Sequence, residues 1–189
     1  MFFLALSCIE TLKKPYKILL MIQRSNGDVF LSLTLINKLF EHYKFPQIDL
    51  LVNEDTIAVA QLFPHINKII KFSYKAKQKN RFKQEKIIIT SLFKKYDLSI
   101  NLTASDRSVL YALLSGKKSI SAIEHDNKKS WWKKLLLSSY YYFDNNRHIL
   151  LNNLEVLNLL QIKYSPIQSS LIVSEKTKSL VKNRLNEMG

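Results

Sequence analysis

The chain has 189 residues, of which 47% are hydrophobic, and its formal net charge is +14. This length and composition suffice for a domain with a real core, which excludes an intrinsically disordered protein. One cysteine, Cys8, and three glycines exclude a disulfide framework, a cysteine metal site and the glycine-rich phosphate loops of ordinary P-loop and dinucleotide-binding proteins.

The first predicted unit is a strand, a loop and a helix. Residues 18–22 form a continuous apolar run, as expected for a parallel strand that is buried on both faces. After the loop Arg24–Asp28, apolar residues recur every three or four positions through 29–43 and predict one amphipathic helix. Gly27 permits a tight turn and leaves room for a ligand to approach closely.

Asp28 lies in the first turn of this helix, where a negative charge suits the helix dipole. Ligands of open α/β sheets usually bind outside the carboxyl ends of the strands, so a carboxylate in this loop is a candidate catalytic group. Asp28 would equally serve as a simple helix cap. The residues alone leave both interpretations open.

The same alternation continues along the chain. The sequence predicts strands at 47–52, 67–72, 97–102 and 118–123, helices at 55–63 and 105–115, and a basic loop passing into a helix over 74–95. Asp106 is predicted to cap the helix that follows it. Repeated alternation of this kind implies parallel strands with right-handed crossovers. We therefore predict an α/β fold, a Rossmann-like open parallel sheet with helices on both faces.

The pattern changes after the fifth predicted strand. Residues 124–144 are basic and aromatic and are predicted to be irregular, and a leucine-rich helix follows at 146–161. Pro166 marks a break before one more predicted helix at 174–188. The predicted organisation is an N-terminal extension (1–16), a Rossmann-like domain (17–165) and the start of a linker or second domain (166–189).

Several short segments occur in a characteristic order and spacing. They are Arg24-Ser25-Asn26-Gly27-Asp28-Val29 after the first strand, Ile48–Asn53, Phe63–Ile70, Tyr96–Leu102 followed by Arg107-Ser108, Ser115–Lys118, and His148 before the leucine-rich helix. Together they resemble the N-terminal domain of the glycosyltransferase family 9 heptosyltransferases. The resemblance implies the N-terminal half of a GT-B enzyme, which transfers heptose from ADP-heptose to the inner core of lipopolysaccharide.

The resemblance also implies roles for particular residues. Asp28 would be the general base, because a sugar hydroxyl is a poor nucleophile until its proton is removed. The acceptor-binding residues would be Arg24, Ser25, Asn26, Gly27, Arg107 and His148, with arginine gripping acceptor phosphates or carboxylates. His148 would equally be an ordinary residue at a helix N-terminus. ADP-heptose would be a substrate, and neither a metal nor a cofactor is expected.

The chain departs from the family pattern in two places. Thr34 stands where the family usually has a proline. The sequence also stops at Gly189, before the family's nucleotide-sugar domain. We therefore expect that domain to be absent, the chain to be truncated and inactive alone, and a separate C-terminal half to be a partner.

The segment 128–143 combines tryptophan, tyrosine and lysine, residue types that suit the headgroup region of a membrane. Trp131, Trp132, Lys133 and Lys134 are predicted to contact the cytoplasmic face of the bacterial inner membrane. Alternatively, these aromatic residues fold back onto the core or onto a missing domain. The basic run 75–86 is either a solvated face or a contact with anionic lipid.

The net charge implies an anionic partner, of which a lipopolysaccharide acceptor is the main candidate. Aromatic residues among lysines also suit nucleic acid, but no helix-turn-helix, zinc-finger or RNP pattern is found, which argues against nucleic acid as a partner. The alternatives are a non-catalytic remnant and a basic module that binds nucleic acid or anionic lipid.

Overall fold

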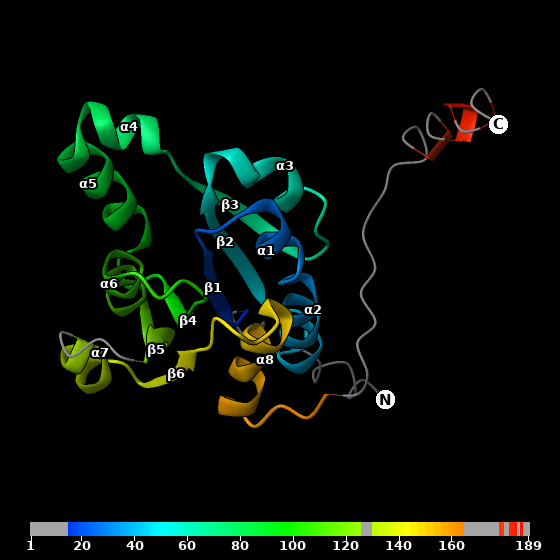
Figure 1. Ribbon diagram of the computed structural model, residues 1–189. Coiled ribbons are helices and arrows are strands. Elements are labelled where there is room, and N and C mark those ends of the chain that lie inside the picture. Colours follow the sequence, from blue (N-terminus) through cyan, green and yellow to red (C-terminus); the bar gives the residue numbers. More distant parts are fainter. Residues whose placement is uncertain (1–14, 126–129, 165–177, 180–181, 185, 187–189) are drawn as a thin grey trace, which may run out of the picture.

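The computed structural model describes residues 15–125 and 130–164, together with short stretches between 178 and 186. The predicted extension 1–16 and the predicted helix 174–188 lie largely outside the described residues. The described body is a sheet with helices packed against it (Figure 1).

Within the described residues, six parallel strands form the sheet, in the order β3-β2-β1-β4-β5-β6. They are β1 (Lys17–Ile22), β2 (Gln47–Asn53), β3 (Ile66–Phe72), β4 (Tyr96–Asn101), β5 (Gly116–Glu124) and β6 (Ser139–Phe143). Ile18 of β1 pairs with Ile48 of β2 on one side and with Leu98 of β4 on the other. This arrangement confirms the predicted parallel Rossmann-like sheet.

The side chains of β1 show why its sequence does not alternate between apolar and polar residues. Ile18, Leu20 and Ile22 join the hydrophobic cluster on one face of the sheet, whereas Leu19 and Met21 join the cluster on the other face. A central strand covered on both sides needs an apolar residue at every position.

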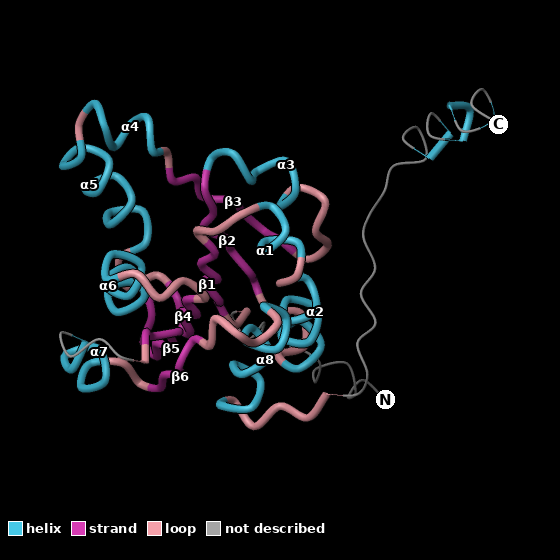
Figure 2. The backbone as a smooth tube through the Cα atoms, viewed as in Figure 1, coloured by secondary structure: helices cyan, strands magenta, loops and turns pink. Residues whose placement is uncertain are grey.

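Helices cover both faces of the sheet, as predicted (Figures 1 and 2). One cluster unites the strands with α1 (Asn26–Phe30), α2 (Leu33–His42), α3 (Ile57–Ala60), which follows the 3-10 helix η1 (Glu54–Thr56), and α8 (Ile149–Leu159). The other cluster unites them with α5 (Arg81–Leu92) and α6 (Asp106–Ser115). Two further helices are α4 (Tyr74–Lys79), which contacts α5, and α7 (Trp131–Leu136).

The segment 29–43 forms parts of two helices, so the prediction of one continuous helix was wrong. The break between α1 and α2 falls at Leu31 and Ser32. The Ser32 hydroxyl donates to the Val29 carbonyl oxygen at 2.6 Å. A serine that bonds to nearby backbone competes with regular helical hydrogen bonding.

The basic segment 74–95 also differs from its prediction, because it contains two helices and not a loop that leads into one. Asn80 separates α4 from α5 with an extended backbone (φ −156°, ψ 93°). Its Oδ1 accepts a hydrogen bond from the Lys83 amide at 2.9 Å. Asparagine is one of the strongest N-cap residues, and this cap starts α5.

Residues 124–144 are not irregular, since they contain α7 and the sixth strand β6. Tyr141 is buried, whereas its neighbour Tyr142 is exposed. Alternating burial is typical of a half-buried strand, and the composition hides it because four of the five residues of β6, Tyr140–Phe143, are aromatic. In the part of the chain that the structure describes, no helix is long and apolar enough to cross a bilayer.

Candidate functional site

The strand order places a topological switch point between β1 and β4. The chain leaves β1 toward β2 and β3 on one side and then crosses to β4 on the other. In open α/β sheets, ligands bind outside the carboxyl ends of the strands at such a point. The loop after β1 and the loop after β4 therefore form the candidate site.

The loop after β1 is fixed by a serine cap. Ser25 has an extended backbone, and its Oγ accepts a hydrogen bond from the Asp28 amide at 3.4 Å. Ser25 is therefore the N-cap of α1, and the interpretation of Asp28 as the cap was wrong. The prediction that Asp106 caps its helix was wrong for the same reason, because Ser105 Oγ accepts from the Ser108 amide.

Because Ser25 caps α1, the Asp28 carboxylate is not used as a cap, and it lies beside the side chain of Arg24. Arg24 Nη1 lies 3.9 Å from Asp28 Oδ2, and the two side chains are 24% and 27% exposed. The Arg24 guanidinium also lies 4.0 Å from the ring centroid of Phe143, at the end of β6. This stacking holds the guanidinium beside Asp28 without consuming either carboxylate oxygen.

Gly27 does not serve the tight turn that its sequence position predicted. Its φ is not positive, and a Cβ atom added there would approach no atom more closely than Ser25 Oγ at 3.9 Å. The conformation of the loop therefore does not require glycine. The predicted close approach of a ligand at Gly27 stays a prediction.

Polar groups without hydrogen-bond partners collect beside this loop. Both side-chain amide atoms of Gln23, Nε of Arg24 and Oδ1 of Asn53 are buried and unpartnered. Asn53 uses its other amide atom, Nδ2, to donate to the Arg24 carbonyl oxygen at 3.3 Å. Buried polar atoms normally find partners within the protein, so this edge holds unused hydrogen-bonding capacity next to Asp28.

The loop after β4 is built differently, because its polar groups bond to one another. Asn101 Nδ2 donates to the Thr103 carbonyl oxygen, Ser108 Oγ and Ser121 Oγ, and its Oδ1 accepts from the Thr103 amide. The Thr103 hydroxyl oxygen in turn accepts a hydrogen bond from the backbone amide of Gln23 at 3.0 Å. This network ties the loop to the start of the loop after β1 and supports it.

Arg107, a predicted acceptor contact, packs against the end of β3. Its guanidinium carbon is 3.9 Å from the ring centroid of Phe72, at the end of β3, within the cluster covered by α5 and α6. Burial and a hydrogen bond to Glu85 raise the pKa of the neighbouring Tyr111, and the positive charge of Arg107 opposes this rise. Both arginines thus stack on an aromatic ring, but Arg24 also lies beside the carboxylate of Asp28.

His148 caps α8. Its Nδ1 accepts a hydrogen bond from the Leu150 amide at 3.3 Å, and the residue is exposed. This geometry accounts for a histidine at the start of the leucine-rich helix without a ligand. Its role in acceptor binding stays a prediction.

Comparison with known proteins decides which fold family this is. No family model matches the chain. Over 114 residues it is 32% identical to lipopolysaccharide heptosyltransferase 3 of Escherichia coli, covering 57% of this chain and 32% of that protein. A solved family 9 glycosyl transferase from Veillonella parvula superposes with a TM-score of 0.70 at 18% identity, covering 92% of this chain and 49% of that one.

Two solved enzymes of E. coli give the same result. Heptosyltransferase WaaC, solved with ADP-2-deoxy-2-fluoro heptose, has a TM-score of 0.65 at 15% identity, covering 82% of this chain and 51% of its own. ADP-heptose lps heptosyltransferase II has a TM-score of 0.63 at 20% identity, covering 89% and 50%. This chain has a glycosyltransferase family 9 fold.

The chain spans about a third of the length of the curated relative and about half of the solved chains. The part of the glycosyltransferase family 9 fold seen here is the six-stranded parallel sheet with its helices. Within it, sequence reasoning missed Gln23 and Phe143 and did not single out Asn53. Asn53 directly follows the strand predicted at 47–52, and a polar residue at that position was the available signal.

The structure of α7 tests only part of the predicted membrane contact, because it shows which of its side chains are exposed. Trp131 and Lys134 are exposed, and Trp132 is partly buried against α6 and β5 residues. A hydrogen bond with Tyr142 raises the pKa of Lys134. These three side chains leave the membrane prediction open.

The prediction that Lys133 contacts the membrane was wrong, because its side chain is buried. Its Nζ lies 2.6 Å from Asp106 Oδ1 and donates to the Ala104 carbonyl oxygen at 3.3 Å. In this glycosyltransferase family 9 fold, Lys133 therefore fastens α7 to the loop after β4. An ammonium that is fully covered in this way does not reach a membrane surface.

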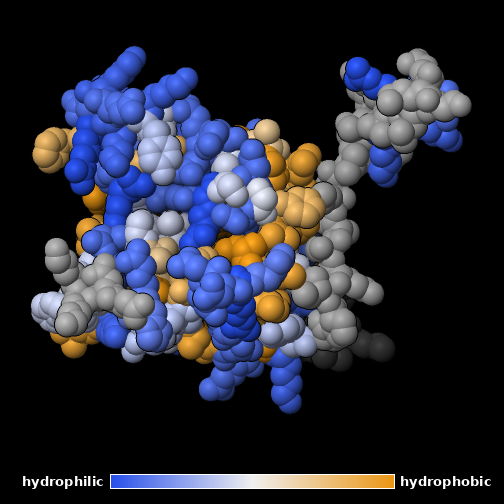
Figure 3. Space-filling view, viewed as in Figure 1, coloured by the Kyte–Doolittle hydropathy of each residue, from blue (hydrophilic) through white to orange (hydrophobic). Residues whose placement is uncertain are grey.

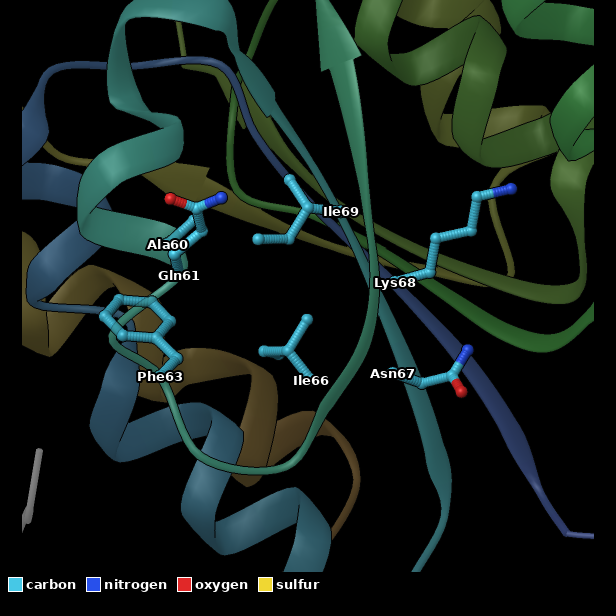
Figure 4. A pocket seen from close by; sticks show the side chains of 7 residues that line it. All are labelled: Ala60, Gln61, Phe63, Ile66, Asn67, Lys68 and Ile69. Atoms are coloured by element: carbon cyan, nitrogen blue, oxygen red, sulfur yellow. The ribbon is translucent and has the colours of Figure 1, made fainter. Parts of the chain in front are cut away.

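A hollow of about 250 Å³ at the amino-terminal half of β3 lies away from the switch point. Phe63, Ile66 and Ile69 point into it, whereas Asn67 and Lys68 extend to the other side of the strand (Figure 4). Gln61 lines it as well, and no carboxylate, histidine or cysteine side chain is among its lining residues. Among the described residues of this glycosyltransferase family 9 fold, no cluster of His, Cys, Asp and Glu side chains is suited to a metal ion.

Proposed function

We propose that this chain forms the acceptor-side half of a lipopolysaccharide core glycosyltransferase that uses ADP-heptose as its donor. One observation carries the proposal: the Asp28 carboxylate is held beside Arg24 at the carboxyl end of β1, at the switch point of the sheet. The proteins with a similar sequence or fold include lipopolysaccharide heptosyltransferases, one of them solved with an ADP-heptose analogue.

In the proposed mechanism Asp28 is the general base. Its carboxylate accepts the proton of an acceptor hydroxyl as that oxygen attacks the anomeric carbon of the donor sugar. The bond from that carbon to the diphosphate breaks, and ADP leaves with the electron pair. Arg24 positions the carboxylate, since a separation of 3.9 Å is longer than that of a close ion pair and leaves the carboxylate oxygens available to substrate.

The acceptor side of the proposal rests on charge and exposure. Ser25, Asn26 and Gly27 are exposed around Asp28, and the formal net charge of +14 favours an anionic acceptor. Arg107 and His148 are proposed as more distant acceptor contacts. Exposed Trp131 and Lys134 are proposed to face the headgroups of the inner membrane on its cytoplasmic side.

The donor contacts are assigned to a second domain. The solved relatives are about twice as long as the part that this chain matches. We therefore propose residues 17–165 as the acceptor-side domain and a nucleotide-sugar domain, in the same or a separate chain, as the holder of ADP-heptose. The experiment below accordingly uses the protein isolated from its own cells with whatever chain accompanies it.

The test is ADP release from ADP-heptose with lipopolysaccharide that lacks its outer heptose. Asp28→Asn should lower the transfer rate by about 10²–10⁴-fold, the usual contribution of a general base. Its stability should change by less than about 0.5 kcal/mol, because the α1 cap is Ser25 and the side chain is partly exposed.

Asp55→Asn is the matched control. Asp55 is an exposed aspartate in the helix that follows β2, at the same edge of the sheet. This variant should retain the parental transfer rate. Equal rates for Asp28→Asn and the parent protein would remove Asp28 from the reaction, and binding of acceptor without any transfer by the parent protein would favour a non-catalytic binding domain.

A further inference from the structure

A second pocket lies between α4, α5 and the carboxyl end of β3. Its volume is about 510 Å³, within the range of small-molecule sites. Ala76, Ile87 and Ile88 supply apolar lining, and Lys71, Lys79 and Lys83 line it as well. The surface over these two helices is predominantly hydrophilic (Figure 3), so the pocket is an apolar recess within a basic region.

The lysines of the pocket suit an anionic group. Lys71 is paired with Glu54 at 3.5 Å, whereas no ion pair is found for Lys79 or Lys83 within the described residues. Lysine stems lie along apolar surface while their ammonium groups stay near water. Two unpaired ammonium groups at one pocket repel each other, and an anion between them removes that repulsion.

Gln84 is the second, independent feature. It is 8% exposed, it lines the pocket, and both of its side-chain amide atoms are buried without a partner. A buried amide that bonds to nothing in the protein costs stability. A ligand headgroup in the pocket would supply acceptors and donors for it.

We propose that this pocket binds one chain of an anionic membrane lipid, with the lipid phosphate held by Lys79, Lys83 and Gln84. The apolar lining covers the alkyl chain, and the lysines hold the phosphate by charge-assisted hydrogen bonds. The site anchors the described domain to individual lipid molecules through α4 and α5. It does so whether or not Asp28 is a catalytic base.

The test uses dodecyl phosphate below its micelle-forming concentration, titrated into the full chain by calorimetry. Lys79→Gln with Lys83→Gln should weaken binding by about tenfold or more, because it removes both charge-assisted hydrogen bonds to the phosphate. Gln84→Leu, which keeps the volume of the side chain, should weaken it by about threefold to tenfold. Ala76→Phe, which fills the recess, should abolish it.

The matched control is Lys75→Gln with Lys86→Gln. Both lysines are exposed on the same two helices and do not line the pocket, so the net charge changes equally. Binding should stay within about twofold of the parent, because exposed charges at a distance are screened by salt. An equal loss in both double variants would reduce the effect to net charge and overturn the proposal.

Other probes separate the possible ligands. Inorganic phosphate lacks the alkyl chain, and dodecyl maltoside lacks the phosphate. Each should therefore bind at least about tenfold more weakly than dodecyl phosphate. Vesicles that contain phosphatidylglycerol should retain the chain, and the Ala76→Phe variant should be retained less. Equal binding of inorganic phosphate, or no binding of dodecyl phosphate, would overturn the proposal.

Discussion

The amino-terminal and carboxyl-terminal edges of the sheet, formed by the two ends of its strands, differ in how their buried and half-buried polar groups are hydrogen-bonded. At the amino-terminal edge, Asp49 accepts hydrogen bonds from Asn67 and Tyr96, and Asp97 accepts from the Lys17 amide and from Lys117. At the carboxyl-terminal edge, atoms of Gln23, Arg24 and Asn53 are buried without partners.

The difference separates an end of the sheet whose polar groups are paired from an end with unused hydrogen-bonding capacity, where we propose that a ligand binds. Paired polar groups stabilise the end of a sheet that holds the structure together. Unpaired polar groups cost stability, and natural proteins retain them mainly at sites where a ligand completes the bonding. The loop after β4, with its network around Asn101, is the scaffold that supports the unpaired side.

The largest expected effect comes from breaking the paired edge. Asp49→Ala removes the acceptor of the Tyr96 hydroxyl at 2.8 Å and of Asn67 Nδ2 at 2.7 Å. Both donors then lose their partner, and the free energy of unfolding should fall by about 3 kcal/mol, as measured by urea denaturation. Asp55→Ala, at an exposed position, should change it by less than about 0.5 kcal/mol.

Tyr96→Phe should cost less than Asp49→Ala, because it removes only one of the two bonds. If Asp49→Ala unfolds at the same urea concentration as the parent protein, the paired edge does not stabilise the fold and the comparison is wrong.

A smaller effect of opposite sign is expected at the unpaired edge. Gln23→Leu keeps the side-chain size and removes two buried amide atoms that have no partner. The free energy of unfolding should stay the same or rise by up to about 1 kcal/mol, while transfer or acceptor binding weakens. Gln47→Leu, at the amino end of β2, is the control and should leave acceptor binding unchanged.

A stability loss above about 1 kcal/mol in Gln23→Leu would show that this amide is satisfied in solution. The carboxyl edge would then resemble the amino edge, and its unpaired atoms would not indicate a binding site.

The smallest expected effect concerns pH at the amino edge. The rings of Tyr16 and Tyr43 stack with their centroids 4.4 Å apart, and burial, together with Tyr16, raises the pKa of Tyr43 to about 12. A raised folded-state pKa means that the neutral phenol is favoured in the folded protein. Its contribution to stability is complete below about pH 10, the ordinary tyrosine value, and is lost as the pH rises toward about 12.

Urea midpoints measured between pH 9 and pH 12 test this expectation, since these values bracket the ordinary and the raised tyrosine pKa. Tyr43→Phe should make the midpoint fall less steeply with pH than in the parent protein. Tyr164→Phe, near the end of the described domain, should leave the slope unchanged. Identical slopes in all three proteins would mean that the phenol of Tyr43 ionises as easily in the folded chain as in the unfolded one.

The sequence alone predicted the framework because the framework depends on local patterns. Continuous apolar runs such as residues 18–22 identify central strands, and their alternation with helices implies parallel pairing. It failed where one residue changes the backbone course, as at Ser32 and Asn80, because the competing side-chain bond is not visible in the periodicity. It also failed at β6, where four consecutive aromatic residues mask the period of two.

The candidate site divides in the same way. The position of Asp28 after the first strand followed from the sequence, and so did its neighbours Arg24 and Ser25. Only the tertiary structure decided that Ser25 caps α1, that Phe143 stacks on Arg24, and that the side chain of Lys133, on α7, is buried. The reason is physical: strand and helix patterns arise from neighbours along the chain, whereas a side chain's partners come from segments that meet only when the sheet has assembled.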